Sequence, residues 1–93
     1  MNEHQVRRTA VVKNPQGLHA RPADLIAKLA RTFGARVELI RGADRVDGKS
    51  MLNIMMLGAA EGSVIEIEAI GADANEALAA VGDMIEQIFA EDE

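Results

Sequence analysis

Residues 17–23, Gly-Leu-His-Ala-Arg-Pro-Ala, stand where a run of strand-forming residues gives way to the first helical pattern of the chain. The start of a helix presents backbone N–H groups that lack partners within the helix, together with the positive end of the helix dipole. An anion held at that point therefore meets hydrogen-bond donors. Because a guanidinium matches phosphate oxygens well, His19 and Arg21 at this junction predict a site for a phosphoryl group.

The residues on either side of this stretch predict a strand, a turn and a helix. Residues 5–13 are rich in strand formers, and residues 14–17, Asn-Pro-Gln-Gly, end that run with a turn. Pro22 suits a first helical turn because the N–H that it lacks would have no helical partner there. The helix is expected to extend to Gly34, as the residue after its C-terminal cap. Its apolar positions have the spacing of an amphipathic helix: Ala23, Ile26, Leu29, Ala30 and Phe33.

The middle of the chain predicts two strands and a short helix. Residues 35–40 alternate apolar and charged side chains, as a half-buried strand does, and residues 43–47 can return beside them after a turn. Ser50 stands directly before the apolar residues 51–57, and Gly58 follows them. Serine is a favoured N-cap residue and glycine often follows a helix, so a helix of two turns is expected here.

The last third of the chain predicts a fourth strand and the longest helix. Residues 64–70 alternate apolar residues with glutamates, which indicates a strand with one solvent-exposed face. Asp73 followed by Glu76 resembles a capping box, and the acidic residues 91–93 are expected to fray the far end of the helix. The apolar face of this helix comprises Ala77, Leu78, Val81, Ile85, Ile88 and Phe89.

These elements, in the order βαββαβα, predict an α+β fold. Each strand must bury one face, and the amphipathic helices are available to cover it. We therefore expect an open-faced β-sandwich, in which a four-stranded and mainly antiparallel sheet is covered on one face by helices. A chain of 93 residues is expected to form a single domain over residues 1–93.

Composition narrows the classes of function. The chain has no cysteine, which excludes disulfides and thiolate zinc sites. Its net charge of −5 argues against nucleic-acid binding, and no apolar run approaches the roughly 20 residues that span a membrane. Two histidines without acidic residues at ligand spacing predict no metal site and no organic cofactor. We expect a cytoplasmic protein.

Two stretches of the sequence resemble one known family. Residues 17–23 resemble the active-centre signature of HPr, the histidine-containing phosphocarrier family of the bacterial phosphoenolpyruvate:sugar phosphotransferase system. Residues 48–58 are similar to the regulatory-serine segment of that family and the short apolar helix after it. The likeness runs from Val6 to Phe89, and the HPr fold agrees with the pattern of strands and helices.

The resemblance implies a transiently phosphorylated carrier, a component of a transferase relay rather than a stand-alone enzyme. His19 would accept the phosphoryl group at Nδ1 from enzyme I that has been charged by phosphoenolpyruvate. The recipient would be a histidine of a IIA-type sugar permease component, and Arg21 would bind the phosphate. A monomer is expected.

Four further residues belong to the predicted active centre. Gly17, Ala20 and Pro22 are expected to shape the turn and the phosphate site, chiefly as structural residues. The family often has a small serine or asparagine three residues before its histidine, where this chain has Gln16. A glutamine can donate a hydrogen bond to phosphate through its amide, but from a longer and more mobile arm. Gln16 is therefore a weaker candidate than Arg21.

Ser50 has two predicted roles. As an N-cap residue it stabilises the helix that follows by about 1 kcal/mol. The resemblance adds regulatory phosphorylation of Ser50 by an HPr kinase/phosphorylase. A phosphate there would bring a charge of about −1.5 to −2 to the helix start.

The helix after Ser50 is expected to provide a docking surface. Residues 51–57 contain too many apolar side chains for one buried face, so some of them must be exposed. Exposed methionines are common at surfaces that adapt to several partners. By family position, Met51, Leu52 and Met55 are the predicted contacts near His19.

Two other interpretations stay open at this point. One is a regulatory binding module of the same fold, either a nitrogen-type or a serine-phosphorylated relative of HPr, which controls partner proteins. The other is a small α+β domain without transfer activity. An intact histidine in the motif favours the carrier, because a purely regulatory module needs no nucleophile.

Overall fold

The computed structural model describes residues 4–92, and the side chains of residues 4–87. Over this range the predicted βαββαβα order is confirmed. The predictions for the side chains of Ile88 and Phe89, and for the acidic residues 91–93, lie outside the described side chains. The elements are β1 (Gln5–Val11), α1 (Ala20–Ala30), β2 (Arg36–Arg41), β3 (Asp44–Asp47), α2 (Met51–Met56), β4 (Val64–Ile70) and α3 (Ala74–Asp92).

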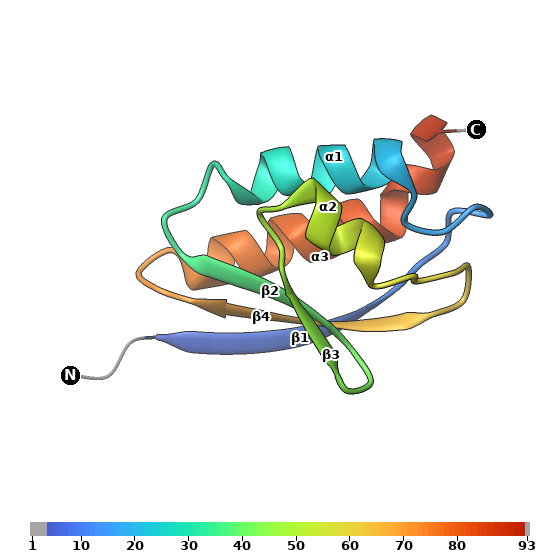
Figure 1. The fold of residues 1–93 in the computed structure, drawn as a ribbon. Helices are drawn as coiled ribbons and strands as arrows, with labels where there is room; N and C mark the ends of the chain where they lie inside the picture. The colour runs from blue at the N-terminus through green and yellow to red at the C-terminus, as the bar shows by residue number, and fades with distance from the viewer. Residues whose placement is uncertain (1–3, 93) are drawn as a thin grey trace.

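Within the described residues the strands form one four-stranded sheet in the order β1-β4-β2-β3, and every neighbouring pair is antiparallel. Figure 1 shows α1, α2 and α3 on one side of this sheet, while the other side carries no helix. The predicted open-faced β-sandwich is therefore confirmed. The last strand of the sequence, β4, lies in the interior of the sheet between β1 and β2.

The open face of the sheet carries a network of ion pairs centred on Glu68. This side chain was expected to be solvent-exposed, but the residue is only 4% exposed. The Glu68 carboxylate accepts a hydrogen bond of 2.6 Å from Arg45 Nη1 and one of 2.8 Å from Arg7 Nε. Gln5 donates a third hydrogen bond to it. The Arg45 hydrogen bond is the main cause that lowers the pKa of Glu68 to about 2. Long side chains from β1 and β3 thus cover the glutamate and pair with it.

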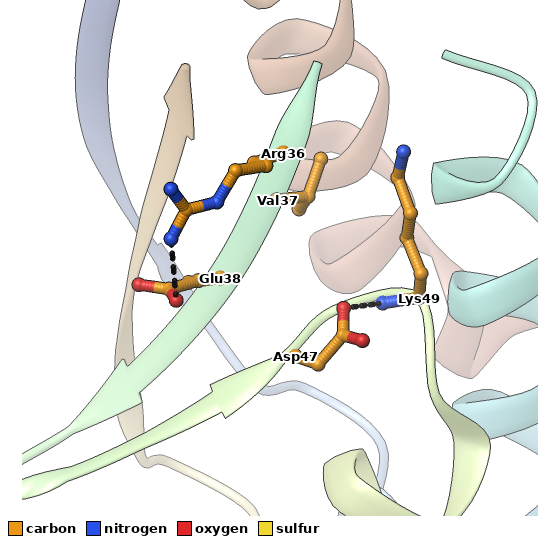
Figure 2. A pocket seen from close by; sticks show the side chains of 5 residues that line it. All are labelled: Arg36, Val37, Glu38, Asp47 and Lys49. Atoms are coloured by element: carbon orange, nitrogen blue, oxygen red, sulfur yellow. Dashed lines mark hydrogen bonds and ion pairs between the residues drawn. The ribbon is translucent and has the colours of Figure 1, made fainter. Parts of the chain in front are cut away.

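A pocket of about 340 Å³ lies where β2 extends beyond β3. Figure 2 shows that Arg36 and Glu38 lie together on one side of it, and that Asp47 lies beside the backbone of Lys49. Arg36 Nη2 is 3.6 Å from Glu38 Oε2, and Asp47 Oδ1 accepts a hydrogen bond of 2.9 Å from the Lys49 N–H. The Lys49 ammonium donates to the Phe33 carbonyl at 2.8 Å, so of the charges that line this pocket only Arg36 and Glu38 are paired with one another.

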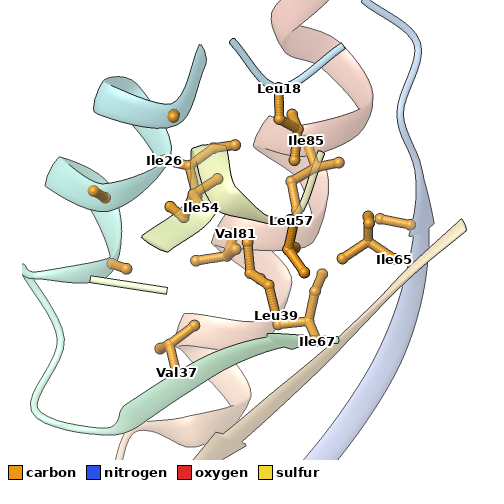
Figure 3. Close-up of a cluster of buried hydrophobic side chains, with 14 of the residues drawn as sticks. Leu18, Ile26, Val37, Leu39, Ile54, Leu57, Ile65, Ile67, Val81 and Ile85 are labelled. Atoms are coloured by element: carbon orange, nitrogen blue, oxygen red, sulfur yellow. The ribbon is translucent and has the colours of Figure 1, made fainter. Parts of the chain in front are cut away.

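The core lies between the sheet and the helices, as Figure 3 shows. Alternate residues of β2 and β4 point into it, including Leu39, Ile65 and Ile67, as their alternation predicts. Leu18, directly before His19, is also buried and anchors the loop between β1 and α1 to the core. Alanine side chains bury the inner face of α1, which allows that helix to pack closely: Ala23, Ala27 and Ala30.

The end of α1 differs from the prediction. The helix stops at Ala30, and Gly34 does not have the left-handed φ expected of a glycine after a helix cap. The carbonyl of Leu29 instead accepts the Thr32 hydroxyl at 2.7 Å and the Thr32 N–H at 3.0 Å. Because these bonds satisfy the helix end, no left-handed glycine is needed there.

The predicted capping box at Asp73 is also wrong. Both carboxylate oxygens of Asp73 turn toward the loop after α1, where they accept hydrogen bonds from the backbone N–H groups of Gly34 (2.9 Å) and Ala35 (2.8 Å). These bonds, chiefly the one from Gly34, lower the pKa of Asp73. Asp73 therefore joins the start of α3 to the α1–β2 loop.

Candidate functional site

His19 is the N-cap residue of α1, at the junction that the sequence predicts. Its backbone is extended, with φ −80° and ψ −167°, and its carbonyl accepts the Ala23 N–H at 2.9 Å. The residue is half-buried, and its side chain does not cap the helix by a hydrogen bond. The imidazole therefore stands at the positive end of α1 with access to solvent.

A buried asparagine closes the turn that precedes His19. Asn14 is 1% exposed, and its Nδ2 donates to the Gly17 carbonyl at 2.7 Å. Its own carbonyl accepts the Gly17 N–H at 2.9 Å, so the turn is closed twice. In the sequence, Asn14 is recognisable only as a turn residue. Asparagine side chains often bond to nearby backbone groups, and this tendency is the only feature of the sequence that points to a supporting role for Asn14.

Gly17 and Leu18 attach this turn to the segment after α2. Gly17 has φ +72°, and a Cβ on it would lie 2.3 Å from the Ala59 carbonyl oxygen. That oxygen accepts the Leu18 N–H at 3.0 Å. The backbone before His19 therefore packs directly on the chain that leaves α2, and only glycine fits at position 17.

The other predicted residues of the active centre lie in the same loop and first helical turn. Ala20 and Arg21 are the first two residues of α1, and both are exposed. Pro22 is the third and is buried. Gln16 is exposed in the turn closed by Asn14. The structure thus brings His19, Arg21 and Gln16 to one end of α1.

Ser50 lies at the other end of α1. It is the N-cap residue of α2, as predicted, and its Oγ accepts the Asn53 N–H at 3.2 Å. Arg31 Nη1 donates to the Lys49 carbonyl at 2.8 Å, which holds the start of α2 beside the residue that follows α1. The Lys49 ammonium also donates to the Phe33 carbonyl at 2.8 Å, so two bonds join the residue before Ser50 to the segment that follows α1.

Three apolar side chains of α2 form an exposed surface, here called the α2 patch. Leu52 is 67% exposed, Met55 37% and Met56 78%. Met51, also predicted as an exposed contact, is half-buried and packs in part against the core. Met51 lies three residues before the buried Ile54 and thus on the same face of the helix. Met56, which sequence analysis did not single out, is the most exposed of the three.

The remaining features of the described residues place no other chemistry near His19. The pocket lined by Arg36 and Lys49 lies at the opposite end of α1. Among residues 4–87, no group of three or more histidine, aspartate or glutamate side chains is placed to hold a metal ion. In the part of the chain that the structure describes, no helix is both long and apolar enough to cross a membrane.

Comparisons with known proteins agree with this geometry. The family model described as "PTS HPr component phosphorylation site" matches residues 6–87. The chain is 40% identical over 88 residues to the phosphocarrier protein HPr of Neisseria meningitidis serogroup A, which covers 95% of this chain and 99% of that protein. It is also 42% identical over 79 residues to DhaM of Providencia stuartii, the phosphoryl donor subunit of a PEP-dependent dihydroxyacetone kinase. That match covers 85% of this chain and 17% of DhaM.

A solved structure gives the same result. The crystal structure of HPr from Bacillus anthracis superposes with a TM-score of 0.84 at 35% identity, covering 88% of this chain and 98% of that one. Fold, motif and sequence identity therefore agree over most of the chain. The chain belongs to the HPr family, the phosphocarrier proteins of the phosphotransferase system.

Proposed function

We propose that His19 accepts a phosphoryl group from enzyme I, charged by phosphoenolpyruvate, and passes it to a IIA-type sugar permease component. The observation that carries the proposal is the position of His19 as N-cap residue of α1, within the family's motif. The chain would act as a monomeric, single-domain carrier in the cytoplasm.

The proposed transfer is an exchange of one phosphorus–nitrogen bond for another. A ring nitrogen of His19, Nδ1 by resemblance to the family, attacks the phosphorus carried by the donor histidine, and the donor bond breaks. The negative phosphoryl group then lies near the first-turn N–H groups of α1 and the Arg21 guanidinium. The closed turn of Asn14 and Gly17 keeps the backbone before His19 in place during this exchange.

Incubation of the chain with enzyme I and phosphoenolpyruvate tests this proposal. We expect an acid-labile, base-stable phosphoryl adduct, which is absent from a folded His19→Ala variant. Arg21→Glu should slow formation of the adduct strongly, because it replaces the proposed phosphate ligand with a like charge. An adduct that survives His19→Ala would overturn the assignment of the nucleophile.

The exposure of the α2 patch supports its role as the surface that docks on enzyme I. Leu52 and Met55 were predicted as contacts and are exposed, and Met56 joins them. Met51 would contribute from its half-buried position at the edge of the patch. Replacing Leu52 by aspartate should raise the concentration of carrier that half-saturates enzyme I and leave the fold intact, because Leu52 lies outside the core.

Regulation at Ser50 is a second proposed function. Its hydroxyl caps α2, whose exposed side chains form the docking surface, so a phosphate on Ser50 would bring negative charge and water to that surface. Treatment with ATP and an HPr kinase/phosphorylase, followed by mass spectrometry, would detect the modification. Ser50→Ala is the matched control, and an unmodified Ser50 would leave only the cap role.

The match to DhaM supports a different acceptor as a further candidate. That relative is named as the phosphoryl donor subunit of a dihydroxyacetone kinase. Phosphorylated chain should therefore be offered to a IIA component and, separately, to a dihydroxyacetone kinase of the same organism. The acceptor that removes the phosphoryl group faster identifies the branch, and transfer to neither would favour a regulatory module.

A further inference from the structure

Two methionines of the α2 patch differ from the other described methionines in their exposure. Met55 is 37% exposed and Met56 is 78% exposed, and neither belongs to the core. Met51 and Met84 are half-buried and pack against core residues. A dissolved oxidant must reach the thioether sulfur to react with it, so exposure sets the order in which methionines are oxidised.

We propose that Met56, followed by Met55, is a site of reversible oxidation that weakens docking of the carrier. This inference rests on the proposed docking role of the α2 patch. The co-reactant is a peroxide. A lone pair of the thioether sulfur attacks one peroxide oxygen and the O–O bond breaks. Sulfur loses two electrons and becomes a sulfoxide, while hydrogen peroxide is reduced to water.

The sulfoxide changes the chemistry of the patch without touching the core. It replaces an apolar sulfur with a strong hydrogen-bond acceptor, which must lose its water when a partner covers it. Met56 lies at the last turn of α2, three residues before Ala59, whose carbonyl accepts the Leu18 N–H next to His19. The modified surface therefore leads directly to the phosphorylation loop.

Limited treatment with hydrogen peroxide, followed by removal of the peroxide, tests the inference. Peptide mass mapping should find sulfoxide first at Met56, then at Met55, and last at Met51 and Met84. The carrier concentration that half-saturates enzyme I should rise about tenfold after treatment. The thermal unfolding midpoint should stay unchanged, and methionine sulfoxide reductases should restore transfer.

Each variant is compared with itself before and after treatment. The treated-to-untreated ratio should be about one for Met55→Leu/Met56→Leu, whereas the matched control Met84→Leu should keep the tenfold loss of the wild type. Earlier oxidation of Met51 or Met84, or an oxidised wild type that docks as before, would overturn the inference. An untreated chain that accepts no phosphoryl group would instead overturn the proposed function, and the order of oxidation would still test the site.

Discussion

The starts of α1 and α2 have similar backbones but are held in different ways. His19 and Ser50 are both N-cap residues with extended backbones. Ser50 caps its helix with its own hydroxyl, which accepts the Asn53 N–H. The start of α1 is held instead by neighbours, since Asn14 closes the turn before His19 and the Ala59 carbonyl binds Leu18. The His19 side chain therefore does not cap α1, whereas the Ser50 side chain caps α2.

The substitution with the largest expected effect on this contrast adds a methyl group at Gly17. Gly17→Ala places a Cβ 2.3 Å from the Ala59 carbonyl oxygen, in a backbone with φ +72°. We expect a loss of about 2–5 kcal/mol in the free energy of unfolding, from backbone strain and overpacking together. Urea denaturation measures the loss. The matched control is Gly58→Ala, with φ +63° and no atom within 4 Å of its Cβ, which should lose only about 1–2 kcal/mol. Equal losses at the two glycines would show that Ala59 does not hold the loop.

Glu68 extends the test to a side chain that is held by residues of β1 and β3. Its pKa is about 2 in the folded chain, against a usual 4.5, so its ionised form stabilises the fold above pH 4.5. This contribution falls as the pH decreases from 4.5 to about 2, because the folded carboxylate then takes up its proton. Glu68→Gln should be less stable than the wild type at neutral pH, and the two should converge near pH 2. Denaturation curves at a series of pH values test this, and a gap independent of pH would contradict it.

Removing the Asn14 side chain should disturb the start of α1 from a distance. Asn14→Ala leaves the buried Gly17 carbonyl without its side-chain donor, which should cost about 1–3 kcal/mol. It should also slow phosphorylation of His19 by about tenfold to a hundredfold, because small displacements of a reacting group are costly. Gln16, an exposed residue of the same turn, gives the control. Gln16→Ala should change stability by no more than about 0.5 kcal/mol. An unaltered transfer rate in Asn14→Ala would remove Asn14 from the site.

The same contrast explains which parts of the fold the sequence predicts. Alternation in β2 and β4 and the serine before α2 are local signals, and the structure confirms them. The partners of Asp73 and Glu68 depend on which segments lie beside them in space. Asp73 bonds to residues 38 and 39 positions earlier in the chain. Nothing in the local sequence distinguishes that arrangement from a capping box.

The candidate site divides in the same way. The motif points to His19 and Arg21 because their residue types and spacing suit the proposed transfer of a phosphoryl group. The supports of the loop were not predicted as such, since Asn14 is read as a turn former and Ala59 contributes only a backbone carbonyl. A backbone contact leaves no trace in the side chain of the residue that makes it. The partial burial of Met51 can be predicted from its spacing from Ile54 only once it is known which face of α2 packs on the core.

The smallest expected loss of stability comes from removing the Ser50 cap of α2. Ser50→Ala removes one cap and should lower stability by about 1 kcal/mol, which for a chain of this size shifts the unfolding midpoint by about 4–8 °C. Phosphorylation of His19 by enzyme I should persist, because the two helix starts lie at opposite ends of α1. Ser50→Asp is the matched control, since aspartate caps as well as serine and should retain the stability while adding a charge. If Ser50→Asp docks on enzyme I as tightly as the wild type and Ser50→Ala docks more weakly, the cap itself, and not the charge, maintains the α2 patch.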